Sequence, residues 1–166
     1  MDQDPAGILR AIYAIGRPDE VGKPGLTATV TSAGGWFGGA KAPPAALRQI
    51  PSSALCLDKE LLGEVTYAMT KTGFWSANAW YLNHQRNRAY SLETAKSDGY
   101  LNMPVLFIGA NWDPISDISV SSIAEAQKKY CPTLKEVRLD TGHWPALEKP
   151  AEVNAAILDW LRENGL

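Results

Sequence analysis

The stretch MPVLFIGA, Met103 to Ala110, decides the fold class of this 166-residue chain. Its apolar residues are continuous instead of alternating with polar ones, and the run is bounded by Pro104 and Asn111. A run of this kind is typical of a parallel strand buried on both faces, because helices cover both faces of a parallel sheet. The sequence therefore predicts an α/β protein.

The residues after this strand continue the alternation of helix and strand. A helix is expected to end near Tyr130, and LKEVRL at 134–139 predicts a second strand. Pro150 begins a last helix, which Gly165 ends. The apolar positions of the two helices are Ile118, Val120, Ile123, Ala124 and Ala126 in the first, and Val153, Ile157, Trp160 and Leu161 in the second. The predicted order is strand, helix, strand, helix.

Two polar side chains follow the predicted strands. Asp113 comes after the first strand, and His143 comes after the second, within TGHWPALEKP at 141–150. Neighbouring parallel strands lie about 4.8 Å apart and end at the same edge of the sheet, so these side chains are expected to meet in a hydrogen bond. An Asp that orients one imidazole nitrogen leaves the other free to act as a general base. Either residue alone is typical of an ordinary turn, but their order is that of the last two members of an α/β-hydrolase triad.

The first 100 residues predict helices and loop. One helix is expected to begin at Asp4 and Pro5, a second covers about 58–71, and a third, packed by aromatic residues, lies within GFWSANAWYLNHQRN at 73–87. Most of the glycine and proline lies in segment 16–55, which favours irregular structure.

Within that irregular segment, Trp36 and Phe37 are expected to anchor a surface loop against an apolar neighbour. The alternative is that they wall a pocket, as rigid aromatic side chains often do. The apolar run LTATVT at 26–31 is ambiguous between strand and loop.

Composition excludes several function classes. The chain has 16 basic and 18 acidic residues and a net charge of -2, which gives no positive field for nucleic acid. Cys56 and Cys131 are isolated, so neither a disulfide scaffold nor a zinc site is predicted. The acidic start lacks the pattern of a signal peptide, and no apolar run approaches the roughly 20 residues of a membrane span. We expect a cytoplasmic protein.

Three segments resemble the C-terminal half of the α/β-hydrolase-fold epoxide hydrolases: GFWSANAWYLNHQRN at 73–87, MPVLFIGANWDPIS at 103–116 and LDTGHWPALEKPAEVNAAILDWL at 139–161. The resemblance is weak before residue 55 and strong after residue 72. It implies a partial α/β-hydrolase fold, with a helical cap portion at residues 1–100 and the C-terminal part of the core at residues 101–166.

The resemblance also implies roles for individual residues. Asp113 corresponds to the charge-relay acid and His143 to the histidine that activates water. Tyr81, in WYLN, corresponds to a cap tyrosine that hydrogen-bonds the epoxide oxygen, although without the resemblance it is typical of packing. Leu82 departs from the family pattern, which has arginine there, and His84 has no counterpart with a role.

The reaction implied by the resemblance proceeds in two steps. A carboxylate opens the epoxide and forms an ester of the enzyme, and activated water hydrolyses that ester to release a vicinal diol. The implied substrate is an apolar small-molecule epoxide. Neither a metal nor an organic cofactor is implied.

The nucleophile of this reaction is not found in the chain. No G-x-S-x-G or G-x-D-x-G elbow occurs, and the family's H-G-x-P-like oxyanion loop is also missing. Three explanations are open: an incomplete part of a longer enzyme, a truncated protein that needs a partner to supply the missing half, or a non-catalytic remnant or interaction protein. The alternative to such a partner is a homodimer. A related haloalkane dehalogenase or esterase would keep Asp113 and His143 but has no evident use for Tyr81. The chain alone is expected to be inactive.

Overall fold

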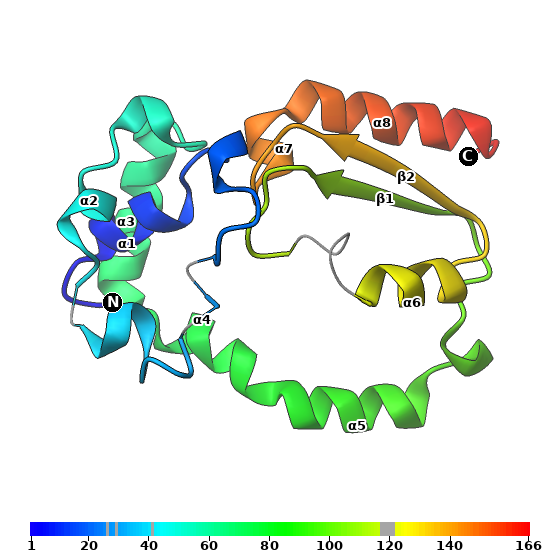
Figure 1. Cartoon of the computed structure of the whole chain (residues 1–166), viewed down its shortest axis with the longest axis horizontal. Helices are drawn as coiled ribbons and strands as arrows, with labels where there is room; N and C mark the ends of the chain where they lie inside the picture. The colour runs from blue at the N-terminus through cyan, green and yellow to red at the C-terminus, as the bar shows by residue number, and fades with distance from the viewer. Residues whose placement is uncertain (26, 29, 41, 117–121) are drawn as a thin grey trace. The chain divides into compact units, whose positions relative to one another are not determined.

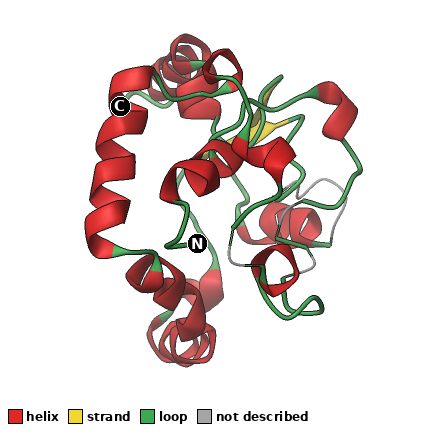
Figure 2. Ribbon diagram, turned by 90° about the vertical axis from the view of Figure 1, so that its left-hand side faces the viewer, coloured by secondary structure: helices red, strands yellow, loops and turns green. Residues whose placement is uncertain are grey.

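The computed structural model describes residues 1–25, 27–28, 30–40, 42–116 and 122–166. The chain divides into two compact units, one of Met1–Ile15 with Pro24–Tyr90 and the other of Gly16–Lys23 with Ser91–Leu166. The described part of the first unit consists of helices and loops, and the two strands lie in the second (Figures 1 and 2). The bounds of these two units differ from those of the predicted cap and core portions, and they do not test that division. The boundary at residue 100 therefore stays a prediction.

The helices of the first unit begin where the sequence provides caps. Asp4 Oδ1 accepts a hydrogen bond from the N–H of Gly7 at 3.0 Å, and Asp58 Oδ1 accepts one from Leu61 at 2.8 Å, so each carboxylate satisfies a free N–H group of a first turn. These caps confirm the predicted starts. The elements are α1 (Pro5–Ile12), η2 (Trp36–Gly39), α2 (Ala45–Arg48), η3 (Ser52–Ala54), α3 (Lys59–Thr72), α4 (Trp75–Ala79), η4 (Trp80–Asn83) and most of α5 (His84–Thr94).

An apolar cluster holds the first unit together. It joins α1, α3 and the segments beside them, and its buried members are Ile8, Leu9, Leu55, Leu57, Leu62 and Phe74. Full burial of such a side chain stabilises the fold by about 1.5–3 kcal/mol. Phe37 packs against this cluster, which confirms that it anchors the glycine-rich loop. Residues 27–28 and 30–31 form turns and not a strand, while Leu26 and Thr29 lie outside the described residues.

The aromatic segment after Gly73 is helical, but its expected packing is wrong. Phe74 is buried at 5% exposure, whereas Trp75, Trp80 and Leu82 are 75%, 72% and 80% exposed. Helical spacing predicts that aromatic side chains pack, but packing also requires an element that covers them. These three side chains are instead largely exposed.

The second unit has the predicted order of strand, helix, strand, helix. Its elements are η1 (Pro18–Glu20), the end of α5, η5 (Ser97–Gly99), β1 (Val105–Ala110), α6 (Ile123–Tyr130), β2 (Leu134–Leu139), α7 (Pro145–Glu148) and α8 (Pro150–Glu163). Strands β1 and β2 pair in parallel, with Val105 beside Leu134 and Ala110 beside Leu139. Ile118 and Val120, assigned from sequence to the intervening helix, lie outside the described residues.

Burial of the first strand on both faces is a wrong expectation. In β1 only Gly109 is buried, and its other residues are partly exposed. Helix α8 packs along both strands (Figure 1), with Val153 buried but Ile157 39% exposed. The expectation of burial on both faces comes from larger parallel sheets, which helices cover on both sides. A sheet of two strands exposes more of each strand. In the described ranges, no helix has the length and apolar character needed to cross a membrane.

Candidate active site

The two loops that follow β1 and β2 leave the sheet together. Backbone hydrogen bonds continue past the strand ends, from Asn111 N–H to the Leu139 carbonyl at 2.8 Å and from Trp112 N–H to the Thr141 carbonyl at 2.9 Å. These bonds keep the loops side by side for two more residues. The next side chain on one loop is Asp113, and the other loop carries His143.

Asp113 and His143 contact each other directly. His143 Nδ1 lies 2.9 Å from Asp113 Oδ2, and Asp113 Oδ1 accepts the N–H of Ile115 at 2.8 Å. The Asp113 side chain is 9% exposed, whereas that of His143 is 35% exposed. A carboxylate only accepts hydrogen bonds, so Nδ1 carries the proton and Nε2 of the neutral ring is free to accept one. This arrangement can remove a proton from a water molecule.

Each member of the pair favours the charged form of the other. The hydrogen bond to Asp113 raises the pKa of His143, burial opposes the rise, and the negative charges of Asp113 and Glu148 add to it. Burial pushes the pKa of Asp113 upward, but hydrogen bonds from His143, Ile115 and Ser116 and the imidazolium charge outweigh it, so this pKa is lowered. The site therefore stabilises the imidazolium that forms when His143 takes a proton.

Glu148 is a residue of this site that the sequence analysis missed. It ends α7, and its carboxylate accepts N–H groups from Gly142 at 2.9 Å, Gly16 at 3.1 Å and Trp144 at 3.3 Å. The sequence feature that could have indicated Glu148 is a carboxylate five residues after His143, at the end of a short helix that begins at Pro145. That spacing lets the side chain fold back onto the histidine loop.

Tyr81, the third predicted site residue, lies in η4 of the first unit with a side chain that is 65% exposed. The structure brings Asp113 and His143 together, and the role of Tyr81 stays a prediction.

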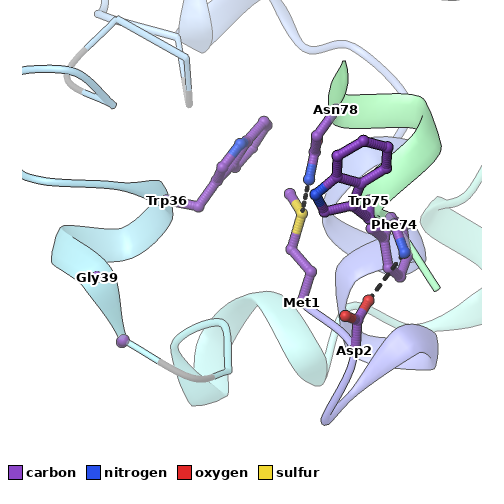
Figure 3. A pocket seen from close by; sticks show the side chains of 8 residues that line it. Met1, Asp2, Trp36, Gly39, Phe74, Trp75 and Asn78 are labelled. Carbon is purple, nitrogen blue, oxygen red and sulfur yellow. Dashed lines mark hydrogen bonds between the residues drawn. The ribbon is translucent and has the colours of Figure 1, made fainter. Parts of the chain in front are cut away.

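The first unit also contains an open hollow of about 290 Å³, shown in Figure 3. Trp36, Phe74 and Trp75 contribute its aromatic lining, so Trp36 walls a hollow while Phe37 packs on the core. Two contacts at the hollow involve the start of the chain. Phe74 N–H donates to Asp2 Oδ1 at 2.8 Å, and Asn78 Nδ2 lies 3.4 Å from the Met1 sulfur.

Known epoxide hydrolases are similar to this chain in both sequence and structure. No protein-family model matches the sequence. Epoxide hydrolase A of Mycobacterium tuberculosis is 31% identical over 106 residues, which are 63% of this chain and 32% of that protein. The crystal structure of epoxide hydrolase A from Mycobacterium thermoresistibile superposes with a TM-score of 0.64 at 26% identity, over 97% of this chain and 47% of that one. The chain is therefore similar in sequence and in fold to part of the α/β-hydrolase-fold epoxide hydrolases.

Further similar proteins come from animals and plants. The mouse bifunctional epoxide hydrolase 2 is 34% identical over 93 residues, 55% of this chain and 16% of that protein. Potato epoxide hydrolase I shares the fold at a TM-score of 0.54 and 23% identity, over 74% of this chain and 37% of that one. The chain thus spans about a third or less of the two curated relatives and about half or less of the two solved structures. In the described ranges, no group of three His, Cys, Asp or Glu side chains is placed to hold a metal.

Replacement of Asp113 by asparagine is expected to lower the pKa of His143, because the amide keeps an acceptor oxygen but loses the negative charge. The ¹H NMR titration of the His143 Cε1 proton measures this change. The chain has two histidines, and a His84→Gln variant identifies the other signal. An unchanged titration of His143 in the Asp113→Asn variant would contradict the contact.

The same pair makes stability depend on pH. Because folding raises the pKa of His143, this residue stabilises the folded state fully when the pH is below its unfolded pKa of about 6.5, and the stabilisation is lost as pH rises through the folded pKa. Because folding lowers the pKa of Asp113, this residue stabilises the folded state when the pH is above its unfolded pKa of about 3.9, and the stabilisation is lost as pH falls through the folded pKa. Urea unfolding should therefore show a larger advantage of wild type over Asp113→Asn at about pH 5 than at about pH 8.5.

Proposed function

We propose that this chain supplies the water-activating part of an epoxide hydrolase, with Asp113 and His143 as the charge-relay acid and the general base. The observation that carries the proposal is the 2.9 Å contact between His143 Nδ1 and Asp113 Oδ2, at the shared edge of two parallel strands. The homology to epoxide hydrolases supports the choice of reaction.

The first step of the reaction involves neither Asp113 nor His143. A carboxylate attacks one epoxide carbon, the carbon–oxygen bond breaks, and the ring oxygen takes a proton to become a hydroxyl group. We assign the donation of that proton to Tyr81, because a phenol O–H can donate to the oxygen of the opening ring. The product of this step is an ester between the enzyme and the opened substrate.

His143 acts in the second step. Nε2 takes a proton from water as the water oxygen attacks the ester carbonyl carbon, and the resulting imidazolium is paired with Asp113. Collapse of the tetrahedral intermediate expels the diol oxygen, which receives the proton held by His143. The second proton of the water returns to the Tyr81 phenolate, which restores both the phenol and the carboxylate. The 166 residues contain neither G-x-S-x-G nor G-x-D-x-G, so we place the nucleophile and the oxyanion donors in a segment outside them, on the same chain or on a partner.

The test is a chimera in which this chain replaces the segment that it matches in epoxide hydrolase A of Mycobacterium thermoresistibile. We expect the chimera to convert an aryl epoxide to its diol and the 166-residue chain alone to form none. An aryl ester and a haloalkane serve as competing substrates. Turnover of the ester or the haloalkane without diol formation would favour an esterase or a dehalogenase, and a folded chimera without any turnover would favour a non-catalytic protein.

A further inference from the structure

The proposed reaction gives no role to Glu148, although its carboxylate makes several hydrogen bonds with the backbone. It accepts hydrogen bonds from three N–H groups, of which Gly142 and Trp144 immediately precede and follow His143. The third comes from Gly16, 132 positions earlier in the sequence. A single side chain therefore joins the histidine loop to the segment Gly16–Lys23 of the same unit.

The position of these donors bears on the direction of the His143 side chain. The Trp144 N–H belongs to the peptide group that directly follows His143, and the Gly142 N–H belongs to the peptide group that joins Thr141 to Gly142. Because one carboxylate accepts both, a backbone rotation at His143 that moves either N–H breaks a hydrogen bond to a charged acceptor, and such bonds are about twice as strong as neutral ones. Glu148 thus holds the backbone from which the imidazole reaches Asp113.

We propose that Glu148 is a positioning residue for His143: its carboxylate holds the backbone on both sides of the histidine and keeps Nδ1 against Asp113. The expected effect of Glu148 on catalysis rests on the proposed function, whereas its effect on the position of His143 does not. The charge of Glu148 acts in the same direction, since it favours the imidazolium. Among the described residues, Asp113 and Glu148 are the charged groups that raise the pKa of His143.

The first variant is Glu148→Gln in the 166-residue chain, in a His84→Gln background that leaves one histidine signal. Glutamine keeps the length of the side chain but removes the charge and one acceptor oxygen. We expect the pKa of His143 to fall and the amide signals of Gly142 and Trp144 to shift. The matched control is Glu152→Gln, which removes an exposed carboxylate that pairs with Lys149 in the first turn of α8 and should leave these signals unchanged.

A second variant separates charge from geometry and protects the test against a glutamine variant that unfolds. Glu148→Asp keeps the charge but shortens the side chain by one methylene. We expect it to keep the pKa of His143 raised while the amide signals of Gly142 and Trp144 move. If either variant loses stability while the pKa of His143 and both amide signals stay at their wild-type positions, Glu148 serves only the fold and the inference is overturned.

The chimera then tests the catalytic part. Glu148→Gln is expected to lower kcat for diol formation by about tenfold with little change in KM, because misplacement of a catalytic base slows the chemical step without weakening substrate binding. An unchanged kcat would overturn the catalytic part of the inference. If the parent chimera makes no diol while the NMR changes occur, the proposed function fails and the positioning of His143 by Glu148 stands.

Discussion

Replacement of His143 by glutamine in the chimera is expected to abolish diol release while epoxide opening continues. Glutamine cannot accept a proton from water at neutral pH, so the second step loses its general base, an effect of about 10³-fold. The first step needs a carboxylate and a proton donor but not this base. The ester should therefore accumulate on the protein, and intact mass measurement after addition of an aryl epoxide should show an increase equal to the mass of the epoxide.

The matched control is His84→Gln, which changes the other histidine, an exposed residue at the start of α5. This variant should release diol at the rate of the parent chimera and show no stable adduct. A His143→Gln variant that stays folded, makes no adduct and releases no diol would assign His143 to the first step or to structure. Normal diol release by that variant would refute its role as the base.

The second large effect concerns Gly142. A Cβ atom at this position would lie 2.5 Å from the Cα of Gly16 and 3.1 Å from Glu148 Oε1. The Gly16 contact is with backbone, which cannot yield as the end of a flexible side chain can, so Gly142→Val should lower the free energy of unfolding by about 3 kcal/mol. For a chain of this size the loss corresponds to a fall in melting temperature of about 9 °C, measurable by circular dichroism.

Gly63→Val is the control for this substitution. Gly63 lies inside α3, and a Cβ there would meet no atom within 4 Å. Valine and glycine have similar helix propensities, so the control should unfold within about 0.5 kcal/mol of wild type. Equal stability of the two valine variants would show that the segments at Gly16 and Gly142 separate at little cost.

The sequence was sufficient to predict the strands, which follow from local patterns, and the histidine–aspartate contact, which follows from the parallel pairing of those strands. Runs of apolar residues indicated β1 and β2, and parallel strands end at the same edge of a sheet. That rule placed Asp113 beside His143 although 30 positions separate them in the sequence. Helix starts at Asp4 and Asp58 were equally predictable, since an N-cap acts within one turn.

Features that depend on docking between distant segments could not be predicted. Nothing in the spacing of Trp75 and Trp80 tells whether another element covers them, and both are largely exposed. Glu148 accepts a hydrogen bond from Gly16, a partner that no periodicity or motif connects to it. The close approach of Gly16 and Gly142 is likewise visible only once both backbones are placed.

The bond between Gly16 and Glu148 also bears on the order of folding. It closes a loop across 132 positions, and the entropy lost in closing a loop grows with its length, whereas β1 and β2 join over a much shorter span. The strands should therefore pair before the segment at Gly16 docks. During that interval Glu148 lacks one of its donors, so the Gly16 amide should gain protection from hydrogen exchange later than the amides of the strands.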